Sequence, residues 1–186
     1  PANVQAHTLR GRIAMARDNY QQAERSFKKV TELAPESPLG YLALGQLQAH
    51  EKRYDQALEH YRQALKADPE NRQAMRSIVE LHLRSDGAAE ALQFCQEQLE
   101  IHKRDSKLQS FLYALRAMLH KETDHLAEAE RDYKQAVKHY PDWPTPYYQL
   151  ARLYAQEKDL DKAIEHYEAA NDKRSGHLPT LMHLGM

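Results

Sequence analysis

A spacing of 34 residues runs through most of this chain, and it restricts the possible folds more than any other feature. Prolines recur at this distance at positions 1, 35 and 69. Small and large residues follow in the same register: Ala23, Ala57 and Ala91, then Phe27, Tyr61 and Cys95. After a shift of four residues the pattern returns at Ala129, Tyr133, Ala136 and Pro141, and again at Ala163, Tyr167 and Ala170. A fixed period of this length is typical of repeat proteins, in which each copy is one small structural unit.

Residues 38–71 are the clearest copy, and their pattern predicts a helix, a turn and a second helix. Leucines recur at helical spacing over 39–47, and a second apolar series with the same spacing runs over 54–65. The polar segment 50–53 separates the two series, and Pro69 disfavours helical geometry in the residue before it. Two such helices cannot bury both of their apolar faces alone, so neighbouring copies should stack on one another.

Two further features of the repeat predict local structure. Gly45 and its equivalents Gly11, Ala117 and Ala151 should let the first helix approach the second closely, so that a larger side chain would overpack and cost roughly 1–3 kcal/mol. Short carboxylates at Asp18, Asp86 and Asp124, with Asp159 one position later, are expected to cap the second helix of their repeats.

These residues resemble the tetratricopeptide repeat family. The family pattern is matched over 38–71 by Tyr41, Leu44, Gly45, Ala57, Tyr61 and Pro69. The resemblance implies an all-α fold, a right-handed superhelical α-solenoid forming a single domain over 1–186. The repeats are expected at about 4–37, 38–71, 72–105 (degenerate), 110–143 and 144–177. Residues 178–186 would begin a sixth repeat or form a capping helix, and both ends read as cut from within a longer array.

The segment 102–109 carries the four residues that break the 34-residue register. Two explanations are open at this point: the second helix of the third repeat runs long, or the loop after it bulges. A tolerated insertion, a hinge and a partner contact are all compatible with either.

Composition and motifs argue against catalysis. The chain has a formal net charge of -1 and a pI of about 7.0, without the basic stripe that nucleic-acid binding needs. No apolar run reaches the roughly 20 residues that span a bilayer. Eleven histidines lack metal-ligand spacing, so no cofactor, metal or enzyme activity is predicted. Cys95 is expected to be a buried, inert thiol, and His82 and His120 to be partly buried packing residues.

The resemblance also implies where a partner would bind. Family members characteristically hold peptides or protein segments in a concave groove lined by the first helices. The corresponding residues here are Arg12, Leu42, Gln46, Arg76, Glu80, Arg84, Phe111, Met118, Tyr148 and Arg152. Because arginine suits carboxylates and the set includes apolar side chains, the expected partner is a protein segment with acidic and apolar residues. The carboxylate clamp of chaperone adaptors is absent, since its slots hold Thr8, Arg12, Ala43, Gln73 and Ser77.

The sequence therefore predicts a non-catalytic scaffold for protein–protein interaction within a larger protein or assembly. Its imperfect repeats are similar in style to long bacterial arrays of envelope, secretion and exopolysaccharide systems. The alternative is a recruiting module of an enzyme whose catalytic domain lies outside this chain. An RNA-binding helical repeat is disfavoured by the period and the pI. A soluble protein of the cytoplasm or the periplasm is expected, and homo-oligomerisation is left open.

Overall fold

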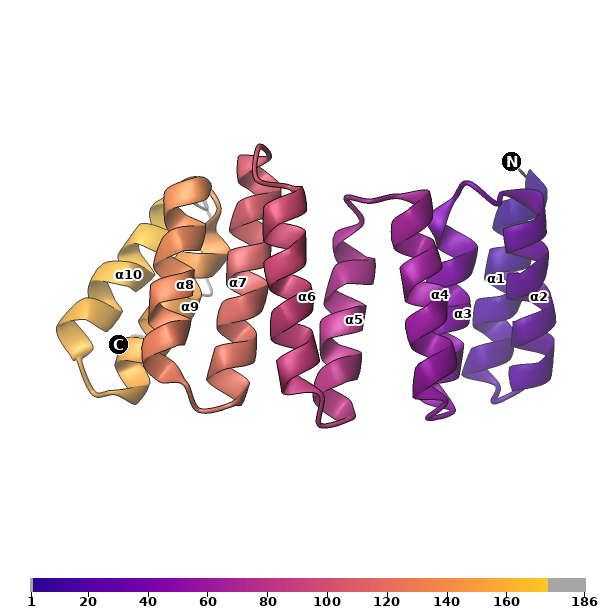
Figure 1. Cartoon of the computed structure of the whole chain (residues 1–186), viewed down its shortest axis with the longest axis horizontal. Helices are drawn as coiled ribbons and strands as arrows, with labels where there is room; N and C mark the ends of the chain where they lie inside the picture. The colour runs from indigo at the N-terminus through magenta and orange to yellow at the C-terminus, as the bar shows by residue number, and fades with distance from the viewer. Residues whose placement is uncertain (1, 174–186) are drawn as a thin grey trace. The chain divides into compact units, whose positions relative to one another are not determined.

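The structure is a computed structural model that describes residues 2–173. These residues form ten α-helices and no strand (Figure 1). The helices are α1 (Ala2–Ala16), α2 (Tyr20–Leu33), α3 (Pro38–His50), α4 (Tyr54–Ala67), α5 (Arg72–Arg84), α6 (Ala88–Ile101), α7 (Ser106–Glu122), α8 (Leu126–His139), α9 (Pro144–Gln156) and α10 (Leu160–Lys173). The predicted all-α helical repeat is confirmed. The sixth repeat or capping helix expected at 178–186 lies outside the described residues.

The helices group into two compact units, one of α1–α5 and one of α6–α10. The single domain over 1–186 and its repeat bounds stay a prediction. In the first unit α1 packs on α2, α2 on α3, α3 on α4 and α4 on α5. In the second unit α6 packs on α7, α7 on α8, α8 on α9 and α9 on α10. The division follows α5 and therefore falls inside the third repeat, which the sequence had marked as degenerate.

The turn inside each repeat places one non-glycine residue in the left-handed backbone region. These residues are Asp18 (φ 55°), Lys52 (φ 60°), Asp86 (φ 57°), Asp124 (φ 61°) and Lys158 (φ 64°). The expectation that Asp18, Asp86 and Asp124 cap the second helix is thus wrong, because each lies inside the turn and not at the cap position. Aspartate is tolerated there because its short polar side chain suits a left-handed backbone.

In the first repeat the capping role belongs to the residue after the turn aspartate. The side chain of Asn19 accepts a hydrogen bond from the Gln22 backbone N–H at 3.1 Å, and this caps α2. The cap predicted at Asp159 is confirmed, because its Oδ1 accepts from the Lys162 N–H at 3.3 Å. Asp159 differs from the other three aspartates because it lies one position later, outside the left-handed turn.

The four extra residues lengthen a first helix, which corrects both explanations offered for segment 102–109. The connections between repeats all have the same length, at 34–37, 68–71, 102–105 and 140–143. By contrast, α7 has 17 residues, whereas the first helices α3, α5 and α9 each have 13. The chain therefore keeps its loop geometry and adds one helical turn at the start of α7, where Asp105 caps the helix through the Leu108 N–H at 2.9 Å.

Close contact between the two helices of a repeat depends on glycine in the first unit, as predicted. A Cβ on Gly11 would lie 2.3 Å from Cε1 of Phe27, and one on Gly45 would lie 2.5 Å from Cε1 of Tyr61. Gly40 has a related role between repeats, since its Cβ would lie 2.6 Å from Cγ2 of Thr31 on α2. The core of this unit is built around these contacts and includes Ala14, Ala23, Phe27, Leu44 and Leu47.

Alanine takes the glycine position in the second unit. Ala117 and Ala151 are fully buried there, and the core around them includes Ala129, Tyr133, Leu150, Leu153, Tyr154 and Ala163. The same interface thus holds a methyl group in this unit.

Candidate binding pocket and polar network

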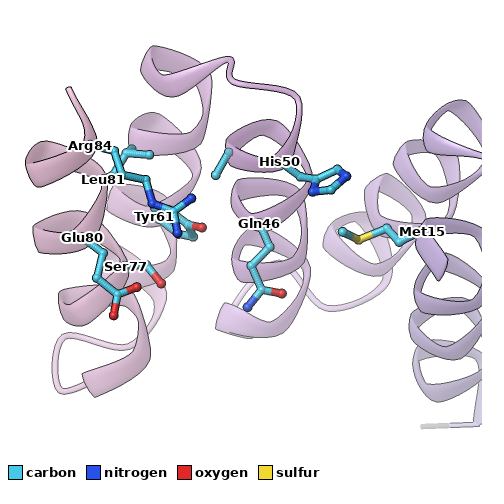
Figure 2. Close-up of a pocket in the computed structure, with 9 residues that line it drawn as sticks. Met15, Gln46, His50, Tyr61, Ser77, Glu80, Leu81 and Arg84 are labelled. Atoms are coloured by element: carbon cyan, nitrogen blue, oxygen red, sulfur yellow. The ribbon is translucent and has the colours of Figure 1, made fainter. Parts of the chain in front are cut away.

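The first unit contains a pocket of about 390 Å³ on the face made by its first helices, α1, α3 and α5 (Figure 2). That volume falls in the range of ligand pockets, about 300–1,000 Å³. Its lining residues are Met15, Gln46, Ala49, His50, Tyr61, Ser77, Glu80, Leu81 and Arg84. Three of the predicted groove residues, Gln46, Glu80 and Arg84, are among them.

Helical spacing explains why these side chains converge. Gln46 and His50 are four residues apart on α3, so they lie on the same face of the helix. Ser77, Glu80, Leu81 and Arg84 follow the same three- and four-residue spacing on α5. Figure 2 shows the two sets projecting from neighbouring helices, with Met15 contributed by α1. The pocket is therefore a direct product of the repeat.

The remaining predicted residues of the first unit lie elsewhere. Arg12 and Arg76 are exposed on α1 and α5 but do not line the pocket. Leu42, expected as an apolar contact for a partner, is only 6% exposed and packs in the unit. Met15 and His50 also line the pocket but were not among the predicted groove residues, although both lie on first helices, as those residues do.

His50 is held at the edge of the pocket by two residues of the preceding repeat. The Tyr20 hydroxyl lies 2.9 Å from Nε2 of His50 and donates a hydrogen bond to Oδ1 of Asp18 at 2.8 Å. This bond to Asp18 raises the pKa of Tyr20. Because Tyr20 has one hydroxyl proton and gives it to Asp18, Nε2 of His50 must carry the proton it shares with Tyr20. In neutral His50 the other nitrogen, Nδ1, is then a hydrogen-bond acceptor.

Tyr61 forms a buried wall of the pocket and packs against Gly45. Burial raises the pKa of its hydroxyl. The Tyr61 hydroxyl therefore stays neutral at ordinary pH, and its ring forms a wall of the pocket. Figure 2 shows Arg84 of α5 beside this ring.

In the second unit the predicted residues are less accessible. Phe111 on α7 is 5% exposed, so it packs within the unit and offers little surface to a partner. Met118 on α7 and Tyr148 on α9 are partly buried, and the Tyr148 ring contacts that of Tyr167 with centroids 5.6 Å apart. Arg152 on α9 is exposed.

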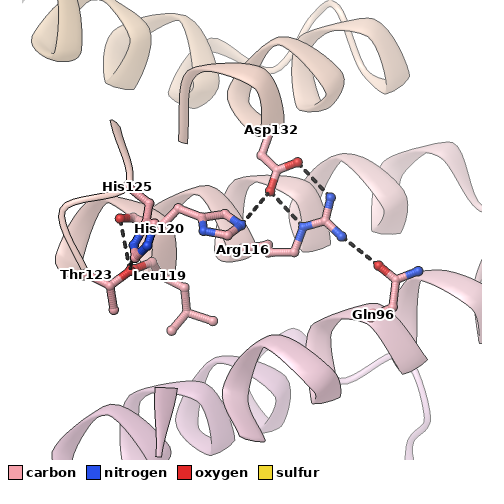
Figure 3. A network of polar contacts seen from close by, with 7 residues as sticks. All are labelled: Gln96, Arg116, Leu119, His120, Thr123, His125 and Asp132. Atoms are coloured by element: carbon pink, nitrogen blue, oxygen red, sulfur yellow. Dashed lines mark hydrogen bonds and ion pairs between the residues drawn. The ribbon is translucent and has the colours of Figure 1, made fainter. Parts of the chain in front are cut away.

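A polar network in the second unit was not anticipated from the sequence (Figure 3). Arg116 on α7 makes two hydrogen bonds to buried Asp132 on α8, from Nε to Oδ2 and from an Nη atom to Oδ1, both at 2.7 Å. Its other Nη atom donates to Oε1 of Gln96 on α6 at 2.7 Å, and Nε2 of His120 lies 3.7 Å from Asp132 Oδ2. The available signal was Arg116 itself, which stands where the repeat has leucine. Arg116 links α7 to α6 and α8 by hydrogen bonds, at a position where leucine would make apolar contacts.

Two of the histidines and the cysteine that could carry chemistry also lie within the described residues. Within residues 2–173 no group of three histidine, cysteine or acidic side chains is placed to hold a metal ion. Cys95 is fully buried, as predicted, and burial raises the pKa of its thiol to about 12. His82 and His120 are partly buried, also as predicted. A search of the described helices for one long and apolar enough to cross a membrane finds none.

Comparison with known families supports the repeat assignment. One model of the tetratricopeptide repeat matches residues 8–71 and 115–177, and a second matches residues 48–119. Together these matches include the degenerate third repeat.

Two curated relatives are much longer than this chain. Cellulose synthase operon protein C of Pseudomonas fluorescens (strain SBW25) is 29% identical over 157 residues, which cover 82% of this chain and 12% of the relative. Anaphase-promoting complex subunit 3 of Schizosaccharomyces pombe is 23% identical over 170 residues, covering 91% of this chain and 25% of the relative. This chain thus spans a quarter or less of the length of either.

Solved structures of the same fold cover nearly all of the chain. TTC0263, a tetratricopeptide repeat protein of Thermus thermophilus, matches with a TM-score of 0.66 and 20% identity, covering 97% of this chain and 96% of that one. YrrB, described as a tetratricopeptide repeat protein with an unusual peptide-binding site, matches with a TM-score of 0.55 and 19% identity, covering 95% of this chain and 89% of that one. At these identities the likeness concerns the fold.

Proposed function

This chain belongs to the tetratricopeptide repeat family, and on that premise we propose that it is a non-catalytic scaffold that holds a segment of a partner protein against the first helices of its first unit. Proteins of this family act as scaffolds for protein interaction. The observation that carries the proposal is the pocket between α1, α3 and α5, in which side chains from three helices face one cavity.

The chemistry of the pocket suits a peptide better than a small apolar ligand. Gln46 can donate and accept hydrogen bonds, and Glu80 and Arg84 supply charges of both signs. Met15 and Leu81 add apolar surface. A peptide presents backbone polar groups and varied side chains, so it can satisfy both kinds of surface. The partner segment is proposed to carry acidic and apolar residues, with Arg12, Arg76 and Arg84 providing positive charge on this face.

The relatives support a place in a larger assembly. One is named as a subunit of a complex, and the other is named as the product of a cellulose synthase operon. We propose that this chain has its scaffold role within a multicomponent bacterial apparatus of the envelope, such as one for secretion or exopolysaccharide. In the second unit, Met118, Tyr148 and Arg152 remain proposed contacts on α7 and α9.

The direct test is to locate a bound peptide. A reporter fluorophore can be placed in the pocket through Gln46→Cys, because native Cys95 is buried and its raised thiol pKa keeps it unreactive. Peptides selected on the chain from a random library displayed on phage should then change the emission of the reporter. The matched control carries the fluorophore at exposed Gln56 on α4, a second helix. Peptides that bind without any response at Gln46, or that affect both reporters equally, would remove the pocket as the binding site.

A further inference from the structure

The pocket of the first unit is lined by two opposite charges that do not pair with each other. Glu80 and Arg84 both line it and are four residues apart on α5. Glutamate four residues before arginine is the favourable order for an ion pair on a helix. The ion pairs among residues 2–173 do not include one between these two side chains, and both charges act on the Tyr61 hydroxyl in the pocket wall. The helix thus presents a cation and an anion to one cavity.

The repeat explains why Arg84 lacks a carboxylate. Arg84 stands one 34-residue period after His50, and Tyr54 stands one period after Tyr20. In the earlier repeat the turn residue Asp18 supplies the carboxylate that anchors Tyr20 and, through it, His50.

The equivalent turn residue in the next repeat is a lysine. Lys52 lies one period after Asp18 and has the same left-handed backbone, with φ of 60° against 55°. Because Lys52 is a cation, the position equivalent to Asp18 supplies no carboxylate to Arg84, and the neighbouring Glu51 pairs with Arg53. The guanidinium therefore remains beside Tyr61, facing the pocket, with its donors available to a ligand.

We infer that this pocket recognises a partner segment that carries a carboxylate and a basic side chain close together, Arg84 pairing with the carboxylate and Glu80 with the cation. The guanidinium suits a carboxylate because it offers two parallel N–H donors. Gln46, on the facing helix, can donate or accept a hydrogen bond from the backbone of the segment. This inference rests on the proposed peptide-binding function and adds the charges that select the peptide.

Recognition of two opposite charges also fixes the direction in which the partner segment binds. A segment entering with its acidic residue near Glu80 and its basic residue near Arg84 would meet like charges at both positions. Such a mismatch is disfavoured, so the pair sets the orientation of the bound segment as well as its composition.

The probe for the test is a random-peptide library displayed on phage, selected in parallel on the wild-type chain, on Arg84→Glu and on Glu80→Lys. Wild-type selections should be enriched in peptides that contain an acidic and a basic residue. Arg84→Glu should lose the acidic preference and bind wild-type peptides at least about tenfold more weakly, as expected for removal of a charge-assisted anchor. Glu80→Lys should lose the basic preference.

A second pair of variants tests the role of the turn without altering any lining residue. Lys52→Asp restores the carboxylate of the preceding repeat, so it should draw Arg84 away and weaken the same peptides by about three- to tenfold. Lys52→Gly keeps the left-handed turn and supplies no acceptor, so it should leave their affinity unchanged. Equal weakening by both variants would contradict the pairing of Arg84 with a ligand carboxylate.

The reporter at Gln46→Cys separates this inference from the proposed function. Peptides that change its emission but lack the charge pair, or bind Arg84→Glu as well as wild type, would overturn the charge inference and leave the pocket as a peptide site. An absence of any peptide response at the reporter would overturn both.

Discussion

The backbone of Gly45 lies so close to Tyr61 that a Cβ there would come within 2.5 Å of ring atom Cε1. Tyr61 cannot move aside easily, because its ring is buried and forms one wall of the pocket. The packing of α3 on α4 and the shape of the candidate site therefore depend on the same pair of residues.

Gly45→Ala is expected to destabilise the first unit by about 1–3 kcal/mol, the usual cost of overpacking, in spite of the better helix propensity of alanine. The measurement is urea unfolding combined with hydrogen exchange, which assigns the loss to α3 and α4. The control is Ala49→Gly, which removes a methyl group on α3 and should cost only the helix propensity of about 1 kcal/mol. Stability equal to or above wild type for Gly45→Ala would show that the ring has room to move.

Arg116→Leu should destabilise the second unit by about 3 kcal/mol, because it leaves the buried carboxylate of Asp132 without its main partner. The double variant Arg116→Leu with Asp132→Leu removes both charges and should regain most of the loss. Thermal unfolding of the two variants measures this. A double variant as unstable as the single one would mean that the network is required for more than charge compensation.

Lys158→Gly should stabilise the second unit by about 0.5–1 kcal/mol, since Lys158 has a left-handed backbone that glycine adopts without strain. Lys158→Ala is the matched control: it also removes the side chain but retains the steric cost of a Cβ, so no gain is expected. The midpoint of urea unfolding distinguishes the two. Equal stabilisation by both would attribute the effect to loss of charge.

Stability should fall as the pH decreases from about 7.5 to about 5.5, because histidines that are neutral in the folded chain must bind protons. Burial lowers the pKa of His60, His120 and His166, so the unfolded chain binds more protons than the folded one as the pH passes below the ordinary histidine value. The contribution of the neutral histidines to stability is complete above the ordinary histidine pKa, and it is lost as the pH falls through their lowered pKa values in the folded chain.

Urea unfolding at both ends of that pH interval measures the slope. Among the three, Nδ1 of His60 is buried without a hydrogen-bond partner, so His60→Gln should reduce the slope. Stability that is constant or higher at the acidic end would contradict the direction of these shifts.

Cys95 should remain unmodified by a thiol reagent in the native chain at neutral pH, since its side chain is buried and burial raises its thiol pKa to about 12. Labelling followed by mass spectrometry tests this, and the same chain in denaturant is the control, in which full modification is expected. Rapid native labelling would show that the third repeat opens readily at α6.

Much of the fold was predictable because it depends on local spacing. The 34-residue period, the helical recurrence of leucines and the position of Gly45 predicted the helix pairs and their close approach. The candidate site was predictable in part for the same reason: the repeat places Gln46 and Glu80 at equivalent positions of α3 and α5, and Arg84 on the same face one turn after Glu80. Leu42 and Phe111 satisfied the same register, but whether a side chain at a helix border faces solvent or core depends on its neighbours.

The sequence by itself determined the repeating helices, because the pattern that forms each pair lies within one period. Only the tertiary structure decided what depends on contacts between distant residues. It divided the helices into two compact units, added the extra turn to α7, and brought Arg116 to Asp132 across 16 positions. It also showed that Asp18 anchors Tyr20 and His50, whereas Lys52, at the same turn one period later, leaves Arg84 to the pocket. The period fixes which positions are equivalent, and the charges that meet in space decide what each equivalent position does.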